Sequence, residues 1–122
     1  MRKLKVLIIT VLILGFTGIA FGAQNEETAK SWQEQATSTR VAVMNVYGEL
    51  EKTGDKGNPV ATELIADAVA QLTEGDKFLK QGDDAMAAKE WEKANFGYNM
   101  AWQYYVKAAT AGLNAKSILA GQ

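Results

Sequence analysis

The stretch from Ala70 to Ala109 constrains the fold most, because it combines helix-forming residues with an unusual density of aromatic side chains. Four large aromatic residues in its second half follow one another at steps of seven, four and three residues, which places them on one face of an α-helix. A single aromatic stripe of this kind usually belongs to a core. We therefore expect the interior of a helical domain to contain Trp91, Tyr98, Trp102 and Tyr105.

A second stripe on the same predicted helix consists of Phe96, Met100 and Tyr104, which repeat at steps of four residues. A domain of three helices offers few neighbours to cover a second stripe. Aromatic residues and methionine are enriched in protein–protein interfaces, where an apolar body and a polar tip both find partners. We predict that these three residues bind a protein partner or a second copy of the chain. Burial in the core and a small-ligand pocket are the alternatives.

Helical periodicity divides the chain after residue 23 into three segments. Apolar residues recur at steps of mostly three and four from Trp32 to Leu50, which predicts a first helix over residues 26–53. A turn cluster at residues 54–59 precedes a second helix over 59–80, and Gly82-Asp83 precedes a third over 84–111. The predicted fold is all-α: one domain over residues 24–122, a three-helix antiparallel bundle, preceded by an N-terminal signal or anchor helix.

The sequence from Ala70 to Ala94 resembles a tetratricopeptide repeat, in which small residues allow two antiparallel helices to cross closely and large residues fill the remaining space. The small positions are Gly75, Ala87 and Ala94, the large ones are Phe78 and Trp91, and the corner is Gly82-Asp83. The resemblance implies that Gly75 and Ala87 face each other across a tight hairpin.

The chain departs from the repeat at three positions. Gln71 and Glu74 replace the usual aromatic residue and leucine, and Asn99 stands where a helix-ending proline is common, so the last helix continues. No companion copy follows or precedes the match, and repeat arrays need about three units to form a continuous groove. The resemblance therefore implies a way of packing two helices and does not imply peptide binding.

Residues 1–23 have the pattern of a secretory signal peptide, with a basic start, an apolar core from Val6 to Leu14, and small residues at Ala20 and Gly22. Export would place the domain in the periplasm or outside the cell. In the alternative, the leader is retained as a single-pass inner-membrane anchor with the domain facing the periplasm, because about 18 apolar residues just span a bilayer. We expect contact with a membrane only in this second case.

The chain contains no cysteine and no histidine, so it lacks a thiol nucleophile, an imidazole base and the softer metal ligands. The carboxylates offer no substitute. Asp55 and Asn58 lack the alternating oxygen ligands and distal glutamate of a calcium loop, and Glu63 and Asp67 have no acid or base partner at a useful spacing. We expect no catalytic residue, no metal site, no bound cofactor and no enzymatic activity.

Charge argues against nucleic acid as a partner. The whole chain has a formal net charge of -1. Three of its basic residues, Arg2, Lys3 and Lys5, belong to the leader, and without them the charge falls to -4. Proteins that bind nucleic acid carry a basic surface. The sequence favours an exported, non-enzymatic helical interaction module that binds a protein partner or self-associates through its aromatic helix face. The alternatives are a membrane-anchored accessory subunit of a larger complex and a small-ligand carrier.

Overall fold

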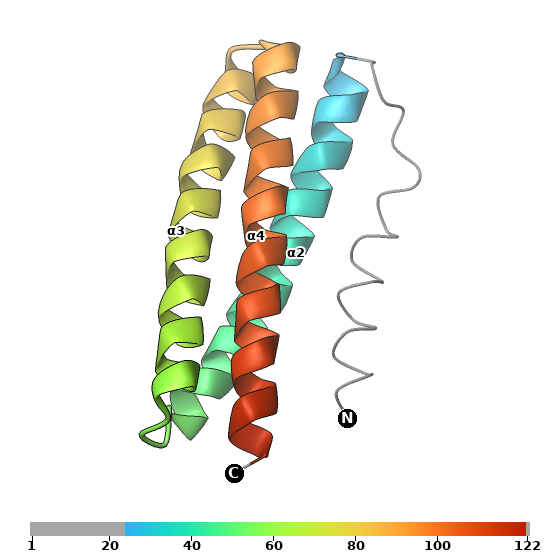
Figure 1. Cartoon of the computed structure of the whole chain (residues 1–122). Coiled ribbons are helices and arrows are strands. Elements are labelled where there is room, and N and C mark those ends of the chain that lie inside the picture. The colour runs from blue at the N-terminus through green and yellow to red at the C-terminus, as the bar shows by residue number, and fades with distance from the viewer. Residues whose placement is uncertain (1–23, 122) are drawn as a thin grey trace.

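The structure, a computed structural model, describes residues 24–121, and this part of the chain forms three α-helices and no strand (Figure 1). Helix α2 spans Glu26–Thr53, α3 spans Pro59–Ala87 and α4 spans Trp91–Ala120. Consecutive helices run in opposite directions and are joined by short connections. The all-α, three-helix prediction is confirmed, whereas the predicted signal or anchor helix lies outside the described residues.

Helix α2 begins and ends at residues with strong local preferences. The backbone N–H of Thr28 donates to Oδ1 of Asn25 at 3.0 Å, and the N–H of Asn25 donates to the hydroxyl of Thr28 at 3.1 Å, so each satisfies an otherwise unpaired group. Gly54, with φ of 71°, ends the helix, and its N–H donates to the carbonyl of Leu50 at 2.8 Å. Asn58 then caps α3 through Oδ1, which accepts from the N–H groups of Val60 and Ala61.

The corner between α3 and α4 lies at residues 88–90, and this corrects the prediction that it lies at Gly82-Asp83. Lys89 takes the left-handed conformation, with φ of 59°. Its N–H donates to the carbonyl of Met86 at 3.0 Å, and the N–H of Glu90 donates to the carbonyl of Ala85 at 2.9 Å. These two bonds form a Schellman motif, which usually has glycine where this chain has Lys89.

Gly82 remains inside α3 because its missing side chain makes room for a neighbouring helix. A Cβ atom on Gly82 would lie 2.6 Å from the ring of Tyr98, and one on Gly97 would lie 2.6 Å from the backbone N of Gly82. The last helix, predicted to end at residue 111, likewise continues through Gly112, and a Cβ there would lie 2.8 Å from Val46. Tertiary packing therefore outweighs the helix-ending preference of these glycines.

Buried residues of α3 and α4 repeat every seven positions, the period of helices that wrap around each other. Helix α3 contributes small residues to this seam, and α4 contributes mostly large ones. The seam consists of Ala61, Ala68, Gly75 and Gly82 on α3 and of Tyr98, Tyr105 and Leu119 on α4, whereas Gly112, at the same spacing, faces Val46 of α2.

The contact that the tetratricopeptide resemblance implies between Gly75 and Ala87 is replaced by a different one. Gly75 faces the ring of Tyr105, and Ala87 is exposed at the end of α3. The two residues belong to the same helix, because α3 does not turn at Gly82. The long hairpin therefore closes two turns beyond the point that the resemblance indicates.

Helix α2 passes behind α4 in Figure 1 and covers the side of the seam that α3 leaves open. Val43 and Leu50 of α2 are buried, and the ring of Trp32 packs edge-on against that of Trp102, with 6.1 Å between centroids. Helix α2 thus completes the core around α4.

Candidate functional site

The predicted interface residues lie on the outer side of α4 and are joined there by a ring from α3. We call the set Phe78, Phe96, Met100 and Tyr104 the aromatic face. The ring of Phe78 stacks on that of Tyr104, with centroids 5.6 Å apart and an interplanar angle of 9°. The same ring meets Phe96 edge-on at 6.2 Å. Met100 lies between Phe96 and Tyr104 on the same helix face by its spacing.

The members of the aromatic face differ in exposure. Phe96 is 59% exposed, the most of any described phenylalanine, tyrosine or tryptophan, while Phe78, Met100 and Tyr104 are half-buried. The ammonium of Lys107 lies 4.9 Å from the centroid of the Tyr104 ring, a cation–π contact at the edge of the surface. The aromatic face is therefore accessible to solvent, and contacts between its own rings fix their positions.

The first aromatic stripe lies mainly inside the bundle. Tyr98 and Tyr105 are fully buried, as is Ala94. Trp91 and Trp102 are half-buried and pack against the core from its edge. Of the residues that the sequence assigns to packing, Phe78 packs against the core and also joins the aromatic face, whereas Ala87 lies on the surface.

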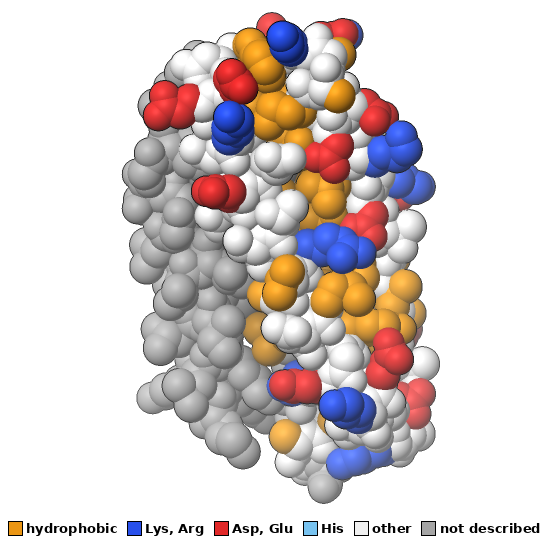
Figure 2. Space-filling model, turned by 180° about the vertical axis from the view of Figure 1, so that it is seen from behind, with side chains coloured by type: hydrophobic (Ala, Val, Ile, Leu, Met, Phe, Trp, Pro, Cys, Tyr) orange, Lys and Arg blue, Asp and Glu red, His pale blue; other side chains and the backbone are white. Residues whose placement is uncertain are grey.

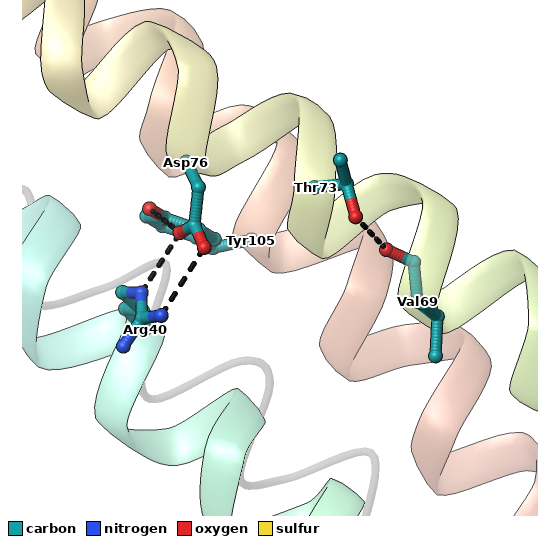
Figure 3. Close-up of polar contacts among 5 residues, drawn as sticks. All are labelled: Arg40, Val69, Thr73, Asp76 and Tyr105. Atoms are coloured by element: carbon teal, nitrogen blue, oxygen red, sulfur yellow. Dashed lines mark hydrogen bonds and ion pairs between the residues drawn. The ribbon is translucent and has the colours of Figure 1, made fainter.

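Three side chains, one from each helix, meet halfway along the bundle (Figure 3). The guanidinium of Arg40 on α2 donates two hydrogen bonds to the carboxylate of Asp76 on α3, at 2.8 and 3.1 Å. The hydroxyl of Tyr105 on α4 donates to Oδ1 of the same carboxylate at 2.6 Å. Asp76 is thus the acceptor at which all three helices are joined.

The same arrangement recurs seven residues along each helix. The hydroxyl of Tyr98 donates to Oδ1 of Asp83 at 2.6 Å, and Nε2 of Gln33 lies 3.2 Å from that oxygen and 3.0 Å from the hydroxyl. In each layer a glycine directly precedes the aspartate and makes room for the tyrosine ring. The two polar layers are therefore copies of one unit, in which glycine admits the ring and aspartate binds its hydroxyl.

The sequence carries a signal for these layers that is not a catalytic motif. Gly-Asp occurs at 75–76 and again at 82–83, seven residues apart, and the tyrosines at 98 and 105 have the same spacing. A repeated pair of this kind on helices is a sign of matching layers across a helical seam. The contribution of α2, Gln33 in one layer and Arg40 in the other, has no common residue type and is visible only in three dimensions.

In the layer that contains Asp76, the hydrogen bonds set the charge states of the side chains. Burial by itself would raise the pKa of the Asp76 carboxyl, but hydrogen bonds from Arg40 and Tyr105 outweigh burial and hold that pKa below its ordinary value. Burial, followed by the bond to Asp76, raises the pKa of Tyr105 far above its ordinary value. The pKa of Tyr98 is raised in the same way by burial and by Asp83. Both tyrosines are thus protonated donors at neutral pH.

These layers have the chemistry of structural joints. A protonated tyrosine whose hydroxyl already binds a carboxylate is neither a base nor a nucleophile at neutral pH. Within residues 24–121, no three acidic side chains come together as a set that could hold a metal ion. A further joint at the end of the bundle connects Nδ2 of the buried Asn95 to Oε1 of Gln24 at 2.8 Å.

None of the described helices is long and apolar enough to span a bilayer. Comparison of the chain with known protein families, with curated proteins and with solved structures finds no match. The aromatic face and the polar layers therefore have to be interpreted from their own geometry.

Proposed function

We propose that the protein is an exported helical module that binds a protein partner through the aromatic face, and that it is not an enzyme. The observation that carries the proposal is the exposure of Phe96, 59%, on a surface whose neighbouring rings are already in contact. Burying an exposed phenylalanine ring contributes roughly 1.5–3 kcal/mol to association. Phe96 would act as the anchor of the interface, and the half-buried Phe78 and Tyr104 would form its floor.

The preformed shape of the face supports this assignment. Because Phe78 stacks on Tyr104, a partner would not have to order those two rings on binding. Lys107 at the edge adds a positive charge next to the rings. A partner that presents an apolar side chain with a nearby carboxylate would match both properties.

Export is the second part of the proposal and is supported by the leader pattern of residues 1–23. In an oxidising compartment many small domains depend on disulfides, but this chain has no cysteine. In place of disulfides, two features hold the helices of this domain together: the polar layers, which join all three helices by hydrogen bonds, and the packed seam between α3 and α4. N-terminal sequencing of the exported protein tests this part, and a chain that retains its first residues would favour the anchor.

The interface is tested by site-specific photo-crosslinking in the native compartment. A photoreactive residue at position 96 should give a discrete adduct with one protein, and the same residue in place of the exposed Ser38 of α2, a helix that contributes nothing to the aromatic face, should not. Phe96→Ala should lower the melting temperature much less than Trp91→Ala, because Trp91 packs against the core. Equal destabilisation by the two variants, without any adduct from position 96, would refute the interface.

A further inference from the structure

A second apolar surface follows the groove between α2 and α3, on a different side of the bundle from the aromatic face. Val41 and Met44 of α2 are 59% and 39% exposed, and Val69 of α3 is 38% exposed. Val41 and Leu79 line the groove together with the Arg40–Asp76 pair. Figure 2 shows hydrophobic side chains gathered in a strip along this face, with charged groups at its edges.

The part of this surface on α2 forms a single stripe. Thr37, Val41, Met44 and Gly48 follow one another at steps of four, three and four residues, so their side chains point the same way. Val41 protrudes from the stripe, whereas Gly48 leaves a gap in it. The stripe therefore contains both a projection and a depression, seven residues apart.

Gly48 differs from the other glycines inside the described helices. A Cβ atom on Gly75, Gly82, Gly97 or Gly112 would meet a neighbour closer than 3 Å, but nothing lies within 4 Å of a Cβ on Gly48. Glycine within a helix destabilises it relative to alanine, so a glycine is expected where a neighbour approaches closely. For Gly48 no described part of the chain is that neighbour.

We propose that this groove is the contact surface between two copies of the chain, related by a two-fold axis that passes between residues 44 and 45 of α2. In that antiparallel arrangement Val41 of each copy lies opposite Gly48 of the other. A two-fold interface requires a surface that is complementary to itself, and a projection paired with its own depression meets this requirement. Met44 then packs against its own counterpart at the axis.

Helix α3 extends the depression around Gly48. The bond between Arg40 and Asp76 sets the level of α3 beside α2. Seven residues after Arg40 on α2 and seven before Asp76 on α3, Tyr47 and Val69 stand at the same level. Val69 is therefore exposed on α3 at about the level of Gly48 on α2. Figure 3 places Val69 and Thr73 along α3 from the ion pair, with the Thr73 hydroxyl turned back to the carbonyl of Val69 at 2.9 Å. Val41 of the second copy would contact Val69 as well as Gly48.

Charges at the two ends of the stripe match the same axis. Glu34 and Lys52 are exposed on one flank of α2, and among the described residues neither belongs to an ion pair. The two-fold axis brings Glu34 of one copy close to Lys52 of the other, and symmetry repeats the pair. Opposite charges at both ends fix the antiparallel direction and disfavour a parallel one.

This contact leaves the aromatic face free, because that face lies on the other side of α3. A dimer of this kind presents two aromatic faces to partners and is independent of the proposed function. Failure of either proposal does not affect the other.

The test is sedimentation of the purified protein over a hundredfold range of concentration, together with three sets of variants. Gly48→Gln should weaken dimerisation by at least about tenfold, equivalent to about 1.4 kcal/mol. The variant should remain folded and, at a concentration where both proteins are monomeric, be at least as heat-stable as the wild type, because its Cβ meets nothing in the monomer. Ser38→Gln, on the solvent side of α2, should leave dimerisation unchanged. Glu34→Lys should weaken the dimer, and Glu34→Lys combined with Lys52→Glu should restore it.

The absence of cysteine allows a second readout with single-cysteine variants. Met44→Cys should form a disulfide-linked dimer on mild oxidation, whereas Gln103→Cys should not. A protein that is monomeric at every concentration would overturn the proposal. So would a dimer that Gly48→Gln leaves intact, or one that is lost with Phe96→Ala, since the latter would assign self-association to the aromatic face.

Discussion

The ring of Tyr105 occupies the space that a side chain at position 75 would need, since a Cβ atom on Gly75 would lie 2.5 Å from its Cε1. One seven-residue repeat away, Gly82 and Tyr98 stand in the same relationship at 2.6 Å. The glycines weaken α3 locally, but they allow two fully buried tyrosines to reach the aspartates next to them.

Gly75→Ala should destabilise the protein by about 1–3 kcal/mol, because the added methyl group overpacks the contact with Tyr105. Gly48→Ala should have the opposite sign and stabilise the isolated chain by about 0.5–1 kcal/mol, since the methyl group meets nothing there. Chemical denaturation at a concentration where the chain is monomeric measures both. Two changes of the same sign would contradict this account of the seam.

Stability on the acid side should depend on Asp76. Its pKa is held below the ordinary value of 3.8 in the folded protein, so its contribution is present above that pH and is lost as the pH falls through the lower folded value. Asp76→Asn should therefore melt below the wild type at neutral pH, and the difference should shrink as the pH approaches about 2. Asp67→Asn, an exposed position on the same helix, serves as control. A difference that stays constant with pH would show that the ion pair with Arg40 is not its source.

Replacing Lys89 should stabilise the corner between α3 and α4. A lysine in the left-handed region costs about 1 kcal/mol or more relative to glycine, which is partly offset by the greater freedom of glycine in the unfolded chain. Lys89→Gly should thus raise the free energy of unfolding by about 0.5–1 kcal/mol. Lys89→Ala, which cannot relieve the strain, should bring no gain. Equal effects of the two variants would point to loss of charge instead of relief of the backbone.

Two neighbouring alanines near the end of α3 should respond differently to the same substitution. Ala85 is buried against Trp32, Ala94 and Tyr98, so Ala85→Leu should overpack the core and cost about 1–3 kcal/mol. Ala87 is exposed, and Ala87→Leu should change stability by less than about 0.5 kcal/mol. Thermal melts of the two variants decide where α3 ends and which of its faces is buried. A large loss with Ala87→Leu would restore the contact that the tetratricopeptide resemblance implies.

The start and end of α2 depend on neighbours in the sequence, and this is why they could be read without a structure. Asn25 caps the helix through a residue three positions away, and Gly54 ends it through its own backbone. The end of α3 could not be read in this way. Glycine is the usual residue at a corner, and the chain places glycines inside its helices and a lysine at the corner itself.

The aromatic face was predictable on α4 and incomplete without α3. The spacing of Phe96, Met100 and Tyr104 is a property of one helix, but the ring that joins them comes from Phe78, 18 residues before Phe96. The sequence assigns Phe78 to the packing of a short hairpin. Phe78 does pack against the core, but its contacts with Phe96 and Tyr104 depend on the register between α3 and α4, which is set by the position of the corner.

The sequence by itself determined the helical class, the bounds of the first helix, and the lack of thiol and imidazole chemistry, because each depends on composition or on residues a few positions apart. Only the tertiary structure decided the role of its glycines and the partners of Asp76 and Asp83. A glycine that ends a helix and one that admits a tyrosine ring look alike along the chain. What separates them is the presence of Tyr98 or Tyr105 on the facing helix, a contact between residues more than 15 positions apart.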